Sequence, residues 1–514
     1  MTSHSDRPEL IRTILEQSRH DPQVPLHFLD LRGGTTETTL GRLVEESLDL
    51  AGALRHQGLR PGDIVAIRGA NTAAYARGVL ATMTAGLISL PLVSLLGDAD
   101  VEQLLDLSGA RLLLSERSGP KRSLDEHLNA LVARGRVPVA VLDDRSLPGT
   151  IELRGPEPAG AVDDSGDFPA DDAVAFCLFT SGTTSTPKGV LHTYRSLLAE
   201  VPDLAADLDL LERGHQLQAF PFGHVAGLDN LLLSLCLGRE MTTLAAWDAT
   251  LAADAVERYG ITAMAGTPFY AATLFDEFDR RGHRPATLRT MLNGGGTVGS
   301  LLVRRADEYG IVMRRAYGST EHPTATSHGP GDPLELRAGT DGAPTRGTRV
   351  RVVDEHGAAV PAGVDGEILL SGPEQFRGYL SGATADLLPD GWFRTGDIGR
   401  LDPAGQLTLT GRKKDIIIRG GENISAGEVE QLLLGCPGIV DAAVVAAPDE
   451  RYGERVAAFY VPDPSGPAVD LDRVRAYFGQ LGVARHKTPE VLRPIAELPR
   501  NSLGKVQKHQ LPTT

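Results

Sequence analysis

Residues 174–189 read VAFCLFTSGTTSTPKG, an apolar run followed by a loop of hydroxyl side chains, glycines and one lysine. The run Val174–Phe179 predicts a buried β-strand. In the loop Thr180–Gly189, backbone N–H groups and hydroxyls can donate to phosphate oxygens while Lys188 neutralises their charge. The residue after Lys188 is Gly189, so the loop lacks the Ser or Thr that holds magnesium in a Walker A motif. The stretch therefore predicts a phosphate-binding loop of another kind.

Helical patterns alternate with short apolar runs on both sides of this loop. Apolar residues recur at helical spacing over 43–54, 249–259 and 301–309, and these patterns lead into the runs 64–67, 261–265 and 311–313. Such alternation is typical of an α/β fold, and we expect a large N-terminal domain of stacked βαβ sheets over residues 1–413. The Pro-, Gly- and Asp-rich segment 155–172 predicts a connection between its subdomains.

The pattern changes after Arg337. Short strands at 349–353 and 366–370 predict a small β-barrel subdomain. From 414 to 514, helices at 427–434 and 471–478 flank strand-like runs at 440–446 and 455–461, which predicts a small, mobile α+β lid domain.

Composition excludes several classes of protein. Of 514 residues 41% are hydrophobic, enough for a large core, and the formal net charge of −16 argues against a nucleic-acid partner. Three widely separated cysteines and an N-terminus without an apolar core predict a cytoplasmic protein without disulfides. The uncharged stretch 78–97 contains Pro91 and three glycines, so we expect a buried helix and strand there and no membrane span.

Six further motifs follow the loop in a fixed order. They are PFGHVAGL at 221–228, NGGGTV at 293–298, YGSTE at 317–321, GWFRTGD at 391–397, GRKKDIIIRGGENIS at 411–425 and LPRNSLGKVQK at 498–508. With the phosphate loop, this series resembles the adenylate-forming superfamily of acyl-CoA synthetases, peptide-synthetase adenylation domains and luciferases. The resemblance covers nearly the whole chain, and it implies ATP, Mg²⁺ and coenzyme A as ligands.

The resemblance implies a nucleotide site whose residues have suitable chemistry. The ring of Tyr317 can stack on adenine, the carboxylate of Asp397 can accept from ribose hydroxyls, and Arg412 can donate to ribose or phosphate. Thr320 and Glu321 are implied beside the α-phosphate, where the Glu321 carboxylate would bind Mg²⁺. The nucleotide-binding positions implied are Thr180, Ser181, Gly182, Thr183, Thr184, Lys188, Gly294, Gly295, Gly296, Tyr317, Gly318, Asp397 and Arg412.

The family places its acyl pocket around the PFGHVAGL motif, where His224 is also a candidate catalytic residue. No aspartate stands beside His224 to pair with an α-ammonium group, so we expect a neutral medium-chain, alicyclic or aromatic acid. The implied pocket residues are Phe222, His224, Val225, Ala226, Gly227 and Gly318.

The C-terminal motifs imply the moving parts of the site. Lys505 occupies the place of the family's catalytic lysine, a mobile cation beside the bond that forms during adenylation. Lys508 and Lys487 stay unassigned. Lys414 occupies the place of the hinge, and Gly420 and Gly421 are implied to let the acceptor pass the backbone.

Within the superfamily, the motifs look most like those of bacterial medium-chain or alicyclic carboxylate CoA ligases. The implied reaction makes acyl-AMP from ATP and a carboxylic acid, releases pyrophosphate, and transfers the acyl group to coenzyme A. Transfer to an amine or to a carrier-protein thiol remains open, as does, more remotely, a catalytically silent binding protein of this fold. We expect a monomer or homodimer.

Overall fold

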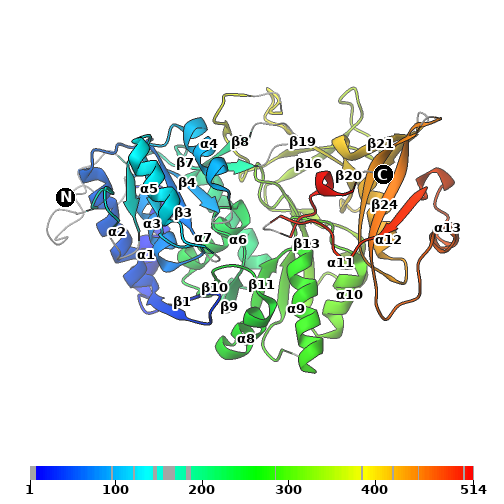
Figure 1. Cartoon of the computed structure of the whole chain (residues 1–514), viewed down its shortest axis with the longest axis horizontal. Coiled ribbons are helices and arrows are strands. Elements are labelled where there is room, and N and C mark those ends of the chain that lie inside the picture. The colour runs from blue at the N-terminus through cyan, green and yellow to red at the C-terminus, as the bar shows by residue number, and fades with distance from the viewer. Residues whose placement is uncertain are drawn as a thin grey trace.

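The computed structural model describes residues 7–93, 96–119, 122–142, 147–153, 168–180, 187–283, 285–383, 386–419, 422–449, 451–501 and 504–512. Two large, mainly parallel sheets form the N-terminal part, and a smaller α+β unit forms the C-terminal end (Figure 1). This confirms the expected α/β class with a small C-terminal domain. Most of segment 155–172 lies outside the described residues.

The first large sheet has nine strands. Its six central strands are parallel neighbours, and short antiparallel strands flank them. In spatial order they are β15 (Ala343–Pro344), β14 (Thr326–Ser327), β13 (Val312–Tyr317), β12 (Thr290–Asn293), β11 (Ala263–Gly266), β9 (His215–Gln218), β10 (Glu240–Leu244), β1 (Pro25–Leu29) and β2 (Thr35–Thr39).

The second large sheet has seven strands and holds the strand quoted at the outset, here β7. β7 is parallel to β4 and antiparallel to β8, which begins at Lys188. The order is β18 (Gly378–Tyr379), β8 (Lys188–Thr193), β7 (Val174–Thr180), β4 (Ile88–Val93), β3 (Ile64–Gly69), β5 (Leu112–Ser115) and β6 (Val139–Val141).

Helices between the two sheets fill the main core. Apolar side chains of both sheets pack there against α1 (Glu9–His20), α2 (Leu40–His56), α3 (Ala73–Thr84), α6 (Tyr194–Asp207) and α7 (Val225–Leu237). α3 packs in this core, and Leu90 and Leu92 of β4 pack in a second cluster with α4 and α5, so residues 78–93 of the uncharged stretch are largely buried as expected. No helix in the described part of the chain is long and apolar enough to cross a membrane.

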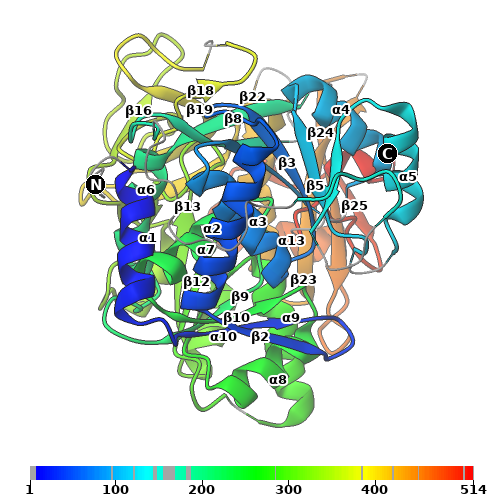
Figure 2. The same ribbon diagram turned by 90° about the vertical axis from the view of Figure 1, so that its left-hand side faces the viewer.

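Other helices cover the outer faces. Figure 2 shows α4 (Asp98–Ser108) and α5 (Asp125–Arg134) outside the seven-stranded sheet. The nine-stranded sheet is covered by α8 (Ala249–Tyr259), α9 (Pro268–Arg281), α10 (Ser300–Glu308) and α11 (Leu334–Gly339).

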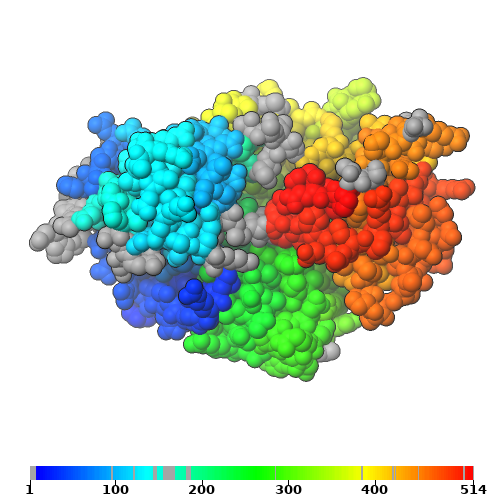
Figure 3. All heavy atoms as spheres, viewed as in Figure 1, coloured from blue at the N-terminus to red at the C-terminus, as the bar shows by residue number. Residues whose placement is uncertain are grey.

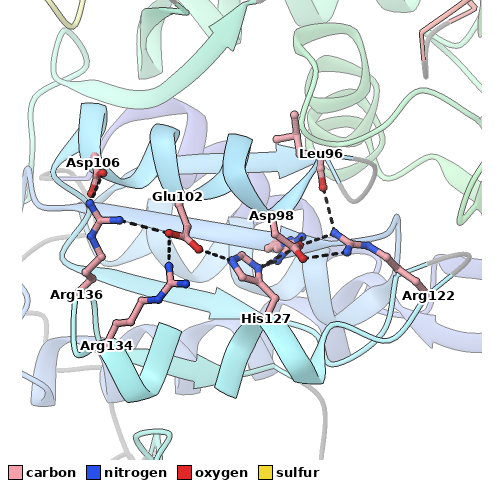
Figure 4. A network of polar contacts seen from close by, with 9 residues as sticks. Leu96, Asp98, Glu102, Asp106, Arg122, His127, Arg134 and Arg136 are labelled. Atoms are coloured by element: carbon pink, nitrogen blue, oxygen red, sulfur yellow. Dashed lines mark hydrogen bonds and ion pairs between the residues drawn. The ribbon is translucent and has the colours of Figure 1, made fainter. Parts of the chain in front are cut away.

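A polar network fastens α4 and α5 to the sheet (Figure 4). The His127 ring lies between Asp98 and Glu102, and the buried Arg68 of β3 donates to Asp98 at 2.9 Å. Arg122 donates to Asp98 and to the carbonyl of Leu96. Because a buried charge is tolerated only when paired, the network explains the burial of Arg68 and fixes the turn that enters α4.

The predicted β-barrel subdomain is an open antiparallel sheet. Its order is β16 (Arg349–Val353), β17 (Gly366–Ser371), β19 (Phe393–Leu401) and β20 (Leu407–Arg412), and among the described residues β20 does not pair back to β16. Four such short strands are too few to close around a packed interior.

The C-terminal unit forms a separate lobe, orange to red in Figure 3. The 3₁₀ turn Lys413–Asp415 joins it to β20. Its elements are β21 (Ile416–Arg419), β22 (Glu422–Ser425), α12 (Ala426–Leu434), β23 (Ile439–Asp449), β24 (Gly453–Pro462), α13 (Leu471–Gln480) and β25 (Val491–Pro494), with 3₁₀ turns at Arg485–Lys487 and Lys508–Gln510. The three cysteines, Cys177, Cys236 and Cys436, are buried and free.

Candidate active site

The carboxyl ends of the parallel strands β9, β12 and β13 bring three of the predicted motifs to one edge of the nine-stranded sheet. PFGHVAGL follows β9, NGGGTV begins as β12 ends, and YGSTE begins as β13 ends. Such an edge is where ligands bind in parallel α/β sheets. Motifs far apart in sequence thus share one face for a simple topological reason.

Tyr317, Asp397 and Arg412 form a connected polar chain. The Tyr317 hydroxyl donates to Asp397 Oδ2 at 2.9 Å, and Arg412 Nε lies 2.9 Å from Asp397 Oδ1. Tyr317 and Asp397 are buried, and burial raises the pKa of Tyr317 well above its ordinary value. The phenol therefore stays a donor, and the carboxylate is held between two donors.

The turn that carries Thr320 and Glu321 is tight. A Cβ at Gly318 would lie 1.6 Å from the Pro323 carbonyl oxygen, so only glycine fits. The backbone N–H of Ser319 donates to the carbonyl of His322 at 2.8 Å, and His192 Nε2 lies 2.7 Å from the Thr320 carbonyl oxygen. The Glu321 carboxylate accepts from the Tyr379 hydroxyl at 2.9 Å and so has a fixed direction.

Lys188 lies across from this turn. Its ammonium is 3.0 Å from Asp386 and 4.8 Å from the ring centroid of Tyr379. Tyr379 thus contacts both Lys188 and Glu321. Sequence reasoning missed Tyr379 and Asp386, since a lone GY pair and a lone aspartate carry no distinctive local pattern.

His224 stands at the N-cap position of α7, at this edge, and its side chain makes no capping hydrogen bond. Burial lowers the pKa of His224 to about 4, so the ring is neutral at pH 7. Val225 and Ala226 are half-buried beside it. Phe222, in contrast, packs 5.9 Å from the ring of Tyr75 in the main core and is only 1% exposed, and a Cβ at Gly227 would clash with the Pro221 carbonyl at 2.0 Å. These last two residues shape the loop from behind.

The C-terminal lobe places Lys505 over the same edge. Its loop rests on α9, where Arg500 lies 5.6 Å from the ring centroid of Phe269 and a Cβ at Gly504 would lie 2.9 Å from Phe269. Lys505 as a whole residue remains exposed, but surrounding protein partly desolvates its ammonium. This desolvation, followed by the charge of Arg412, lowers the pKa of Lys505 to about 8.

The two unassigned lysines have structural partners. Lys487 contacts Glu428 at 2.7 Å, and Lys508 contacts Glu430 at 2.7 Å. Both pairs lie inside the lobe. Six predicted positions, Ser181, Gly182, Thr183, Thr184, Gly420 and Gly421, lie outside the described residues.

Comparison with known proteins also divides the chain into a large N-terminal part and a small C-terminal part. A family model described as "AMP-binding enzyme" matches residues 15–380, and one described as "AMP-binding enzyme C-terminal domain" matches 428–505. A feruloyl-CoA synthase of Amycolatopsis sp. is 33% identical over 495 residues, covering 94% of this chain and 95% of the relative.

Two solved structures are similar over 98% of both chains, at 26% identity. One is o-succinylbenzoate CoA synthetase from Bacillus subtilis in complex with its acyl-adenylate intermediate, with a TM-score of 0.79. The other is the amide bond synthetase McbA from Marinactinospora thermotolerans, with a TM-score of 0.83.

Proposed function

This chain belongs to the AMP-binding enzyme family, and from that premise we propose how its residues divide the reaction. It is an AMP-forming acid–thiol ligase. A carboxylate oxygen attacks the α-phosphorus of ATP, the bond to the β-phosphate breaks, and acyl-AMP and pyrophosphate form. The thiol of coenzyme A then loses its proton and attacks the acyl carbonyl, and AMP leaves. ATP and Mg²⁺ serve the first half-reaction, and coenzyme A is the co-substrate of the second.

The polar chain of Tyr317, Asp397 and Arg412 binds the nucleoside. Asp397 accepts from the ribose hydroxyls, and Arg412, already 2.9 Å from Asp397, bridges ribose and phosphate. Lys188 neutralises the triphosphate. The site fits Mg²⁺ because the Glu321 carboxylate, aimed by Tyr379, is a hard oxygen ligand. A metal held by Glu321 would offset the charge of the triphosphate.

Lys505 assists adenylation, and its position is the observation that carries this assignment. The lobe brings its ammonium close enough to Arg412, Lys414 and Asp397 for their charges to influence its pKa. A cation fixed there stabilises the negative charge that gathers when a carboxylate approaches the α-phosphate. In water the same charge would be screened.

The domain boundary falls between 413 and 414, with Lys414 as the hinge. The 3₁₀ turn Lys413–Asp415 connects β20 of one sheet to β21 of another, and hinges are such element-terminal residues. Rotation there would withdraw Lys505 after adenylation and open a path for the thiol past Gly420 and Gly421.

The substrate is a medium-chain, alicyclic or aromatic carboxylic acid that carries no charged group besides its carboxylate. Two observations support this proposal. The side chains at the first turn of α7, Val225 and Ala226, are small and apolar, and the feruloyl-CoA synthase relative is named for an aromatic acid. The three free cysteines support a cytoplasmic location.

A product assay tests the acceptor. With a panel of acids, ATP and Mg²⁺, we expect pyrophosphate release, and acyl-CoA as the product when coenzyme A and a primary amine compete at equal concentration. The fold shared with McbA makes amide formation the second candidate. Amide as the main product would replace the thiol acceptor, and activity confined to amino acids or dicarboxylates would reject the acid class.

A further inference from the structure

Two carboxyl groups are buried in the interior beside the turn that carries Glu321. Glu200 lies on α6, and Glu374 lies in the segment between β17 and β18; they are 1% and 0% exposed. Glu200 accepts from Thr324, and Glu374 lies 3.6 Å from the ring of His322, so both carboxyl groups lie against residues 322–324. Because an ionised carboxylate can only accept a hydrogen bond, two carboxyl groups buried this close together favour holding one proton between them.

The described surroundings supply no other compensation for Glu374. Neither of its carboxyl oxygens, nor Oε2 of Glu200, has a hydrogen-bond donor in the described part of the chain. The ring of His322 lies 3.6 Å from Glu374, too far for a hydrogen bond. Thr324 donates to Glu200. The other titratable or charged groups around the pair are Asp203 and Asp207 of α6, Asp229 of α7, His192 of β8, Arg314 and Arg346.

Carboxylates outnumber cations in this cluster. Arg346 donates its backbone N–H to Asp203, and Arg314 lies near Asp207 rather than Glu374. Burial raises the pKa of Glu374, with the neighbouring Glu200 adding to the effect, and burial raises the pKa of Glu200. Keeping a proton costs less than burying a second uncompensated charge.

The pair is connected to the catalytic turn on both sides. On one side, the segment that holds Glu374 donates Phe376 N–H to the Glu321 carbonyl at 2.8 Å, and its Tyr379 hydroxyl donates to the Glu321 carboxylate at 2.9 Å. On the other side, Glu200 accepts from Thr324 at the end of the turn. Repulsion between two ionised carboxylates would therefore pull the supports of Glu321 apart.

We propose that Glu200 and Glu374 share one proton and, as a singly charged pair, hold the turn Ser319–Pro323 in the position that presents Glu321 to the metal–nucleotide complex. Glu374 is a positioning residue, acting through the segment that ends in Tyr379. The inference rests on the proposed role of Glu321.

The decisive variant is Glu374→Gln, because an amide N–H replaces the shared O–H at nearly the same size and never ionises. The exposed Glu212 provides the matched control, Glu212→Gln. Two quantities are measured from pH 6 to 9.5: the thermal midpoint, and the KM for Mg-ATP and kcat of ATP–pyrophosphate exchange.

We expect the Gln variant to gain thermal stability over wild type as pH rises, by several degrees at pH 9. The folded wild type binds a proton that the unfolded chain releases near its ordinary pKa of about 4.3, so its stability falls with rising pH, whereas Gln removes that linkage. The KM of the Gln variant for Mg-ATP should stay within about twofold of wild type at pH 7. In wild type we expect this KM to rise at alkaline pH as the pair loses its proton, and in the Gln variant the rise should occur at higher pH. Loss of the Lys505 proton acts on kcat in both proteins.

Glu374→Ala is the second variant, since it removes the hydrogen bond altogether. We expect its KM for Mg-ATP to rise about tenfold, as for loss of one buried hydrogen bond to a charged group, with a smaller change in kcat. A Gln variant that fails to fold, is less stable at every pH, or has the pH dependence of wild type would overturn the shared proton. If the thermal midpoint changes with pH as expected but the KM for Mg-ATP is unchanged in both variants, the positioning role is wrong. The proposed reaction is unaffected by that outcome.

Discussion

Replacing Lys505 by alanine removes one cation from the charged group at the proposed place of adenylation. Lys505, Arg412 and Lys414 lie close enough to interact, with Asp397 and Asp415 beside them. The two remaining cations still attract ATP, so the change should affect the transition state more than nucleotide binding. We therefore expect kcat for acyl-AMP formation to fall with little change in the KM for ATP.

The size of the loss follows from what such a charge does. Removing one preorganised donor from a developing oxyanion costs about 10²- to 10³-fold in rate, or about 2.7–4 kcal/mol. Arg412 remains next to the vacated position and can take over part of the stabilisation, which places Lys505→Ala near the lower figure.

The assay separates the half-reactions. Acyl-AMP formation is followed in a quenched-flow single turnover, and pre-formed acyl-AMP is then mixed with coenzyme A to follow thioester formation. Lys487→Ala is the matched control, because Lys487 lies in the same lobe but contacts Glu428. We expect the control to retain both rates within about threefold, as for loss of a partly exposed ion pair.

An equal loss of both half-reactions in Lys505→Ala would refute the reasoning, since the cation would then not be specific to adenylation. A loss of the same size in Lys487→Ala would show that disturbance of the lobe, rather than the missing charge, causes the effect.

Three further predictions concern the same site. The pKa of Lys505 is lowered to about 8, so the rate of adenylation should be full below that pH and decline above it, and initial rates from pH 6.5 to 9.5 should show no such limb in Lys505→Ala. Tyr317→Phe removes the hydrogen bond to Asp397 and should raise the KM for ATP about fivefold at unchanged kcat in steady-state assays. Lys414→Pro fixes φ near about −65°, so stopped-flow rates should show one half-reaction retained and the other slowed; two unchanged rates would place the hinge elsewhere.

The alternation of helical and strand patterns predicted the α/β architecture well, because the spacing of apolar residues within each element is a local property of the sequence. Helical spacing over 249–259 and the apolar run 174–179 reappear as α8 and β7 with nearly the same bounds. The predicted small barrel is an open four-stranded sheet instead. Closure depends on the number of strands and on which of them pair, and the local sequence of one strand reveals neither.

The sequence by itself predicted the chemistry available to this protein. The hydroxyls, glycines and lysine of Thr180–Gly189 predict a phosphate loop, and the resemblance to a known superfamily implies the roles of Asp397, Arg412 and Lys505. The tertiary structure decided which side chains meet. It turned Phe222 into the core, paired Lys487 and Lys508 within the lobe, joined Tyr379 to Glu321, and buried Glu374 against Glu200. Glu321 and Tyr379 are 58 positions apart, and Lys188 and Asp386 are 198 apart, so no local pattern predicts that they meet. Only packing brings such partners within hydrogen-bonding distance and removes the water that would screen them.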